Sequence, residues 1–240
     1  TQSTWGKLTK QMISVKEKDH CEMAKVLLLK SLLFNLLLGF VLANDPDMLQ
    51  DLCVANSSAG IKINGFPCKE DSSVTAGDFS FSGIAGFGVV NNSVGSLVTS
   101  ASVLKIGGLN TLGISMSRID YIPYGVNPPH THPRASEIIF LLEGELYVGF
   151  VTTANKLISK TLKKGDVFVF PKGLVHFQKN IGGERASVIA AFNSQLPGTQ
   201  QIAMALFGAQ PQIYDEILAT TFHIRVKDVK KVKYNFAPKN

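Results

Sequence analysis

Short apolar segments separated by turn residues fill the middle of the chain, between Ser96 and Asn193. Glycine-containing turns such as Glu143-Gly144 and Gly182-Gly183 divide them, and no helical period lies between them. This pattern indicates an all-β domain, an antiparallel sandwich or barrel. The predicted strands are Thr111–Tyr121, Glu137–Leu142, Leu146–Thr152, Leu157–Leu162, Val167–Phe170, Val175–Gln178 and Ala186–Phe192, with Gln200–Phe207 a candidate for one more.

The pattern differs on both sides of these strands. Residues 44–95 are irregular and rich in Gly, Ser and Asn. After Pro211 and again after Arg225, apolar residues recur at helical spacing, which predicts two short amphipathic helices. Their apolar stripes could cover this domain, but we favour contact with another subunit.

One long apolar run, Val26–Leu42, follows Met23 and Lys25 near the N-terminus. It is short for a bilayer-spanning helix, contains Lys30, and ends in a sequence that signal peptidase could cleave after Ala43. We therefore predict secretion, with a membrane anchor as the alternative. The predicted organisation is an upstream read-through segment (1–22), a signal peptide (23–43) and a single domain (44–240).

The charge of the predicted mature chain is mild. Removing residues 1–43 takes away six of the 24 Lys and Arg residues and three of the 18 Asp and Glu residues, which leaves a net charge of +3. This excess is too small to indicate a nucleic-acid-binding protein.

Two features of the predicted mature chain are typical of secreted proteins. Its two cysteines, Cys53 and Cys68, are expected to form a disulfide, and free buried thiols are the alternative. The chain-entropy model gives such a loop on the order of 3 kcal/mol of stability. Asn56 and Asn91 each begin an Asn-x-Ser triplet, the acceptor pattern for N-glycosylation.

Three of the four histidines of the predicted mature chain lie in two turn-flanked segments. His130 and His132 are two residues apart, so both rings leave the same face of an extended chain. Glu137 begins the next apolar run, and His176 ends another. We predict that these four residues form one metal site built by two hairpins; four separate buried side chains are the alternative.

The types of ligand narrow the choice of metal without selecting one. Imidazoles and a carboxylate, with no thiolate, disfavour Cu(I) and iron–sulfur chemistry but allow Mn, Fe, Zn, Ni or Cu(II). Six-coordinate geometry would leave two open positions for a redox substrate, whereas four protein ligands in a tetrahedron would make zinc structural.

These histidine segments resemble the two sequence boxes of the cupin superfamily, and the surrounding sequence resembles the germin and germin-like proteins of plants. The spacing of the boxes is matched by His130, His132, Glu137 and Gly144, and by Gly165, Pro171, His176 and Asn180. The resemblance extends from about Asp45 to Pro238 and includes Asn64–Cys68, Asn127–His130 and Phe192–Gly198. Tyr124 departs from the pattern, because the first box usually opens with glycine.

This resemblance implies a cupin jelly-roll β-barrel whose C-terminal α-helices make oligomer contacts. It implies a glycosylated homohexamer, arranged as a trimer of dimers, in the apoplast or cell wall, without a membrane anchor in the mature form. It also implies one Mn(II) per subunit, with His130, His132, Glu137 and His176 as its ligands.

Two enzyme activities of the resembled family use the same metal site. Superoxide dismutation needs an open coordination position and a basic approach for a small anion; Arg134 and Lys172 are candidates, or solvated surface charges. Oxalate oxidation needs more donors: oxalate-oxidising germins carry asparagines at the positions of Asn127 and Ser117, and this chain keeps only the first. We therefore rank superoxide dismutase, with a role in plant defence, above oxalate oxidase. The alternative without catalysis is a wall-associated, receptor-associated or storage-like metal-binding module.

Overall fold

The computed structural model describes residue 23 and residues 25–31, 50–61 and 65–237. The chain divides into two units, Thr1–Asn44 and Asp45–Asn240. The described residues of the first unit are helical. Most of the predicted signal peptide, its cleavage point and the upstream segment lie outside the described residues, so these boundaries stay predictions. No helix within the described ranges is long and apolar enough to cross a membrane.

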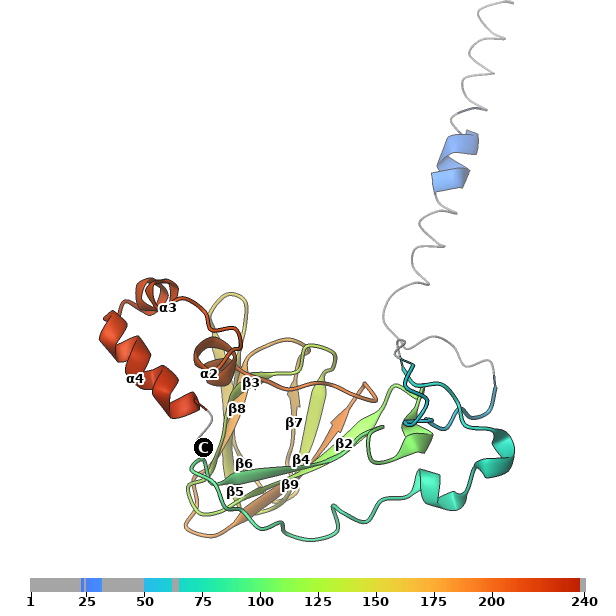
Figure 1. Ribbon diagram of the computed structural model, residues 1–240, viewed down its shortest axis with the longest axis horizontal. Coiled ribbons are helices and arrows are strands. Elements are labelled where there is room, and N and C mark those ends of the chain that lie inside the picture. Colours follow the sequence, from blue (N-terminus) through green and yellow to red (C-terminus); the bar gives the residue numbers. More distant parts are fainter. Residues whose placement is uncertain (1–22, 24, 32–49, 62–64, 238–240) are drawn as a thin grey trace, which may run out of the picture. The chain divides into compact units, whose positions relative to one another are not determined.

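Two five-stranded antiparallel sheets form the barrel of the second unit (Figure 1). The first has the order β1-β2-β9-β4-β7 and the second β10-β3-β8-β5-β6. The strands are β1 (Ser96–Ala101), β2 (Ser115–Tyr121), β3 (Val126–Thr131), β4 (Glu137–Glu143), β5 (Glu145–Val151), β6 (Leu157–Lys163), β7 (Val167–Phe170), β8 (His176–Asn180), β9 (Ala186–Phe192) and β10 (Gln200–Gln201). This arrangement confirms the antiparallel barrel that the strand pattern predicts and the jelly roll that the family resemblance implies.

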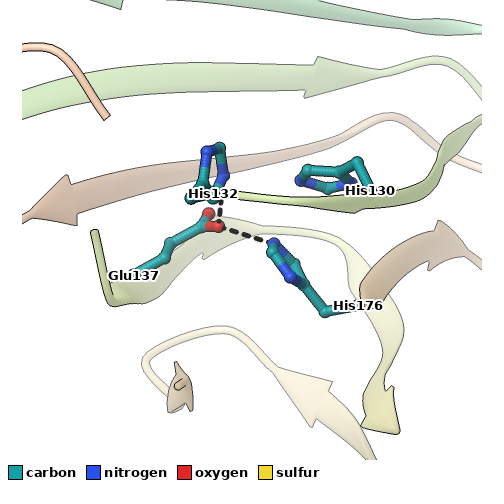
Figure 2. A group of neighbouring side chains, drawn as sticks. All are labelled: His130, His132, Glu137 and His176. Carbon is teal, nitrogen blue, oxygen red and sulfur yellow. Dashed lines mark hydrogen bonds and ion pairs between the residues drawn. The ribbon is translucent and has the colours of Figure 1, made fainter. Parts of the chain in front are cut away.

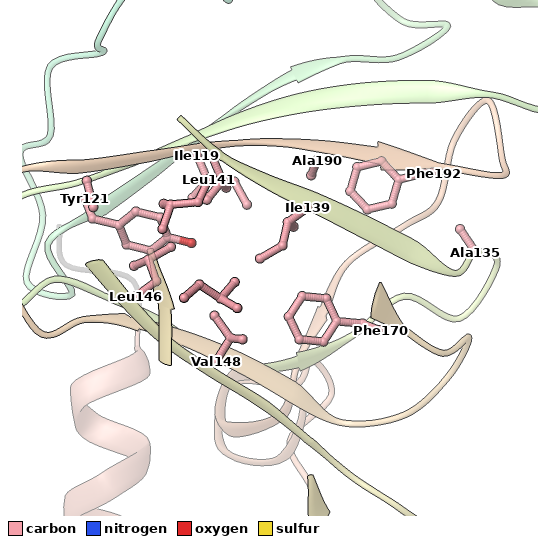
Figure 3. Packing of buried hydrophobic residues seen from close by; sticks show 13 residues of the cluster. Ile119, Tyr121, Ala135, Ile139, Leu141, Leu146, Val148, Phe170, Ala190 and Phe192 are labelled. Atoms are coloured by element: carbon pink, nitrogen blue, oxygen red, sulfur yellow. The ribbon is translucent and has the colours of Figure 1, made fainter. Parts of the chain in front are cut away.

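Inward-facing side chains from both sheets make one hydrophobic core (Figure 3). On β4 the alternation is plain, because Ile139 and Leu141 are fully buried whereas Ile138 and Phe140 are each 45% exposed. Leu146 and Val148 of β5 are also fully buried and belong to the same cluster. The period-two pattern therefore separates an inner apolar face from an outer face that is also partly apolar.

Strand β3 was not among the predicted strands, although it carries the candidate metal ligand His130 and leads directly into His132. Pro128 and Pro129 lack the N–H that a central strand needs, so the segment reads poorly as a strand. The chain accommodates them by a shift of register against β8 between Asn127 and His130. Strand β1 was also missed.

The prediction of a strand over Gln200–Phe207 is wrong for most of its length. Only Gln200–Gln201 pairs, as β10, and Ile202–Phe207 forms helix α2. In this helix Leu206 and Phe207 both pack against the buried cluster of the two C-terminal helices, whereas adjacent residues of a strand would point to opposite sides. Short apolar runs do not distinguish strand from helix by their pattern alone.

The two predicted C-terminal helices are present as α3 (Asp215–Phe222) and α4 (Val226–Phe236). Leu218 of α3 and Val229 of α4 are buried against each other's helix, with α2 beside them (Figure 1). Lys233 is also buried, and its ammonium group donates to the Asp215 carboxylate at 2.6 Å and to the Ile213 carbonyl. The three helices form a small cluster with its own core.

The described residues before β1 form an irregular segment held by a disulfide. Cys53 and Cys68 are bonded, which confirms the predicted pairing. The Asn110 side chain donates to the Phe66 carbonyl at 2.8 Å and accepts from the Phe66 N–H at 3.2 Å, so it fastens this segment to the barrel. The 3-10 helices of this region are η1 (Asp71–Ser73), η2 (Ala76–Phe79) and η3 (Gly107–Leu109).

The backbone conformation of Tyr124 accounts for the glycine with which the first box of the resembled family usually opens. Its φ is +62°, in the left-handed region that L-residues adopt at a cost of about 1 kcal/mol. The turn still closes, with the Gly125 N–H donating to the Ile122 carbonyl at 2.9 Å. The departure therefore leaves β3, with His130 on it and His132 just after it, in place.

Candidate metal centre

Four polar side chains meet inside the barrel from three strands (Figure 2). His130 lies on β3, His132 just after it, Glu137 opens β4 and His176 opens β8, where it pairs with His130. The four side chains are almost completely buried, and one candidate ligand atom from each lies within 4.8 Å of all the others. The structure thus brings together all four residues that the sequence predicts.

A backbone carbonyl holds each imidazole by its Nδ1 atom. The acceptors are the carbonyl oxygens of Pro128 for His130 (2.7 Å), Gly198 for His132 (2.5 Å) and Leu174 for His176 (2.8 Å). Because a carbonyl oxygen only accepts, Nδ1 must carry the hydrogen in each ring. The Nε2 lone pairs are therefore free for a cation, which is the arrangement of metal-binding histidines.

The Glu137 carboxylate gives a direct test of whether a metal fits. Its Oε2 atom lies 3.0 Å from Nε2 of His176 and 3.1 Å from Nε2 of His132. With hydrogen on Nδ1 alone, each contact would join two acceptors, so the arrangement requires either a further proton on the imidazoles or a metal ion between these atoms. Ligand atoms about 3 Å apart suit one ion placed about 2.1 Å from each. Oε1 of Glu137 is buried without a hydrogen-bond partner in the described structure, so the residues fit a metal ion.

The electrostatics of these groups point the same way. Burial, followed by the neighbouring His176, lowers the pKa of His130 to about 4. Burial also opposes charge on His132, but hydrogen bonding to Glu137 outweighs it and raises the pKa of His132. Burial would raise the pKa of Glu137, but hydrogen bonds from His132 and His176 lower it to about 2. At neutral pH the group therefore offers an anionic carboxylate and a neutral His130.

A pocket of about 720 Å³ opens over His130, His132 and Glu137. Asn127 and Ser117, both buried, line it, so the two predicted substrate-proximal residues do lie beside the metal-site residues. Further polar lining comes from Thr99, Ser100, Ser102, Thr199 and Gln201, and apolar lining from residues that include Phe81, Leu104 and Phe192. A small molecule in this pocket would reach the candidate metal centre.

The cations proposed from sequence to attract an anion do not line this pocket. Arg134 instead donates from Nε to the Leu196 carbonyl at 2.8 Å, and Lys172 is exposed. Among the described lining residues, Lys105 is the only one with a positive side chain. No motif marked Lys105, because it lies in a loop whose path the sequence does not predict.

Sequence reasoning also missed Gln178. It follows His176 by two residues on β8, so the alternation of side chains in a strand could have placed it inside the barrel. Its Oε1 accepts from the Tyr121 hydroxyl at 3.4 Å, and its Nε2 has no partner within the described ranges. Burial, and then the charge of Glu137, raises the pKa of Tyr121 well above its usual range, so the phenol stays neutral.

The two candidate glycosylation residues lie outside the barrel core. Asn91 is exposed. Asn56 is half-buried, and its side-chain oxygen accepts from the backbone N–H of Ser58 at 3.2 Å and from the Ser58 hydroxyl at 2.8 Å. Glycosylation at either position stays a prediction.

Comparison with known proteins gives consistent results for sequence and structure. Residues 83–230 match the Cupin family. Germin-like protein subfamily 2 member 4 of Arabidopsis thaliana is 66% identical over 200 residues, which cover 83% of this chain and 91% of that protein. Germin-like protein 5-1 of Oryza sativa subsp. japonica is 59% identical over 197 residues, 82% of this chain and 88% of that protein. A solved structure of recombinant oxalate oxidase in complex with glycolate is 40% identical, with a TM-score of 0.79 over 81% of this chain and 98% of that one.

Proposed function

This chain belongs to the germin-like proteins of the cupin family, and on that premise we propose that it is a secreted manganese superoxide dismutase of the plant cell wall or apoplast. In that role it would convert two superoxide anions and two protons into dioxygen and hydrogen peroxide, which suits a function in defence. The observation that carries the choice of reaction is Ser117, which lines the pocket where oxalate-oxidising germins have asparagine.

His130, His132, Glu137 and His176 would hold the ion, one per subunit. Bound manganese would supply cycling between two oxidation states at an open coordination position. Manganese is favoured by the family resemblance, because these ligand types alone admit several metals.

The chain's own groups would prepare the site for a small anion. The backbone carbonyls fix each ring so that Nε2 faces inward, which lowers the cost of ordering the ligands when metal binds. Lys105, which lines the pocket and is exposed, would attract an anion, and this attraction would weaken with salt. A pocket of this size, lined in part by exposed residues such as Lys105, would admit a diatomic substrate.

Oxalate oxidation is the second candidate, and the solved oxalate oxidase relatives favour it. A bound dianion would need hydrogen-bond donors on more than one side. Asn127 offers an amide, but Ser117 offers a hydroxyl on a shorter side chain. The clamp would therefore be incomplete in this chain.

The substitution Ser117→Asn is expected to create the missing donor. Manganese-loaded S117N should produce hydrogen peroxide from oxalate roughly 100-fold faster than wild type, the usual effect of one well-placed donor. Its dismutase activity should stay within about threefold, because dismutation does not need this clamp. Both rates are measured on the same preparations at mildly acidic and neutral pH.

The control for this prediction is Ser100→Asn, which enlarges the residue paired with Ser117 on the neighbouring strand and in the same pocket. S100N should gain no oxalate activity. Peroxide formation from oxalate by the wild-type protein at a rate comparable to S117N would reverse the ranking of the two reactions. Full manganese occupancy with neither activity would favour the non-catalytic module.

We also propose that the protein assembles as a hexamer, a trimer of dimers, which requires two different contact surfaces. One candidate is the outer face of the first sheet, where cross-strand pairing places Ile138 beside Val169 and Phe140 beside Val167. These four side chains are 45–51% exposed and form one apolar patch. The second is on the C-terminal helices, where Ile217 and Phe222 are exposed.

Val169→Lys is expected to break the contact made by the sheet patch, because a charge in an apolar interface is not solvated. Light scattering coupled to size-exclusion chromatography should show a mass of three chains or fewer, against six for wild type. Val89→Lys is the matched control, because Val89 is exposed and lies outside this patch. A V169K particle of wild-type mass would exclude the sheet patch as an interface.

A further inference from the structure

The segment between β9 and β10 holds one of the metal-site histidines. It supplies the Gly198 carbonyl that accepts from Nδ1 of His132. The end of this segment nearer β9 is fixed by Gln195, whose carbonyl accepts from the Val103 N–H at 3.1 Å and whose amide donates to Asn110 at 3.5 Å. These contacts leave open what fixes the end that touches His132.

Arg134 contacts that end at three consecutive residues. Its backbone N–H donates to the Pro197 carbonyl at 3.2 Å, and its Nε donates to the Leu196 carbonyl at 2.8 Å. Its guanidinium group lies against Gly198, so closely that a Cβ added there would be 2.7 Å from Nη2. Gly198 also has φ +70°, so glycine suits this position on two grounds.

The chemistry of these contacts suits arginine and not merely a positive charge. Arg134 forms no ion pair with an acid in the described part of the chain, and it does not line the pocket. Its planar guanidinium combines a directed N–H with a flat surface, which a lysine ammonium lacks. An exposed arginine bonded in this way acts on backbone position.

We propose that Arg134 is a positioning residue for the metal centre. It fixes the Leu196–Gly198 backbone so that the Gly198 carbonyl holds His132 with hydrogen on Nδ1 and with Nε2 turned towards Glu137. The inference rests on the proposed metal-binding function and adds to it a residue that touches neither metal nor substrate. It also replaces the anion-attracting role that the sequence suggested for Arg134.

The test compares wild type, Arg134→Ala, Arg134→Lys and Lys172→Ala as intact purified oligomers. Each metal-stripped protein is titrated with Mn(II) while electron paramagnetic resonance follows the free ion. R134A should bind Mn(II) roughly tenfold more weakly, the lower end of the effect of outer partners on metal sites. R134K should lose less affinity, and K172A, which removes an exposed positive charge, should stay within about twofold of wild type.

Unchanged Mn(II) affinity in folded R134A, or a K172A loss as large as that of R134A, would overturn the positioning role. If R134A does not fold, R134K decides in its place: weaker binding than wild type supports the proposal, and equal binding overturns it.

A second readout does not depend on the metal. Nitrogen-15 spectra of the histidine rings in the metal-free proteins, recorded at alkaline pH where the rings are neutral and with the His132 signals assigned by His132→Asn, report which nitrogen carries hydrogen. The His132 signal should indicate hydrogen on Nδ1 in wild type and shift towards a mixture in R134A. An unchanged signal in R134A overturns the proposal. If wild type binds no Mn(II) but the His132 signal still shifts in R134A, the proposed function is refuted and the positioning role stands.

Discussion

Purified His176→Ala protein is expected to contain less than a tenth of the manganese of wild type and to lose roughly 100-fold or more of its dismutase activity. The reason is geometric: His176 contributes Nε2 to a buried group in which no other described side chain could replace it. Its loss also removes one of the two imidazoles beside the Glu137 carboxylate. Metal content is measured by elemental analysis, and activity on the same samples.

Thermal unfolding gives an independent check on this result. A ligand present at about 100 times its dissociation constant stabilises the folded state by about 2.7 kcal/mol. Added Mn(II) should therefore raise the melting temperature of the metal-free wild type and leave that of H176A unchanged. The control is His223→Asn, since His223 lies outside the site at the end of α3 with φ +54°, a conformation that asparagine tolerates. Normal manganese content in H176A would show that His176 is not a ligand of the metal.

The substitution Asp120→Asn is expected to lower the free energy of unfolding by about 3–5 kcal/mol, the cost of leaving a buried charge without its partner. Asp120 is fully buried and accepts from Arg118 Nε at 2.7 Å, from the Ser187 hydroxyl at 2.8 Å and from the Gly88 N–H at 2.8 Å. Arg118 is only 8% exposed, so its charge would lose its counter-ion without gaining much water. The Gly88 contact also fastens the segment before β1 to the barrel.

Urea unfolding of metal-free protein at one fixed concentration measures this effect. The double substitution Arg118→Met with Asp120→Leu removes both charges and should recover much of the loss. Asp166→Asn is the surface control, because the Asp166 side chain is 38% exposed and lies 3.5 Å from Lys160, and it should lower the urea midpoint far less than D120N. A D120N protein as stable as D166N would show that the buried network contributes little.

Most of the candidate site could be predicted because its residues lie in short, recognisable sequence patterns. Two histidines two residues apart share a face of any extended strand, and their partners begin or end short apolar runs. The convergence of Glu137 and His176 on that face depends on strand pairing, which the family resemblance implied and the register of β3 with β8 provides. The period-two alternation likewise predicted the core strands.

The errors have physical causes. Strand β3 was not predicted because it contains Pro128 and Pro129. The register shift that accommodates these prolines arises from the pairing of β3 with β8 and cannot be seen in the local sequence. Helix α2 was taken for a strand because packing against α3 and α4, and not its own short pattern, decides its form. Arg134 looked like a charge for attracting anions because its acceptors, the carbonyls of residues 196 and 197, lie more than 60 positions away in the sequence.

The metal content of the native protein tests the central claim most directly. Protein collected from the extracellular fluid without added metal is analysed for manganese, iron, zinc, nickel and copper and assayed for dismutase activity before and after chelation. About one manganese per chain is predicted, with activity that disappears on chelation and returns with Mn(II). Zinc at full occupancy and no dismutase activity would contradict the account.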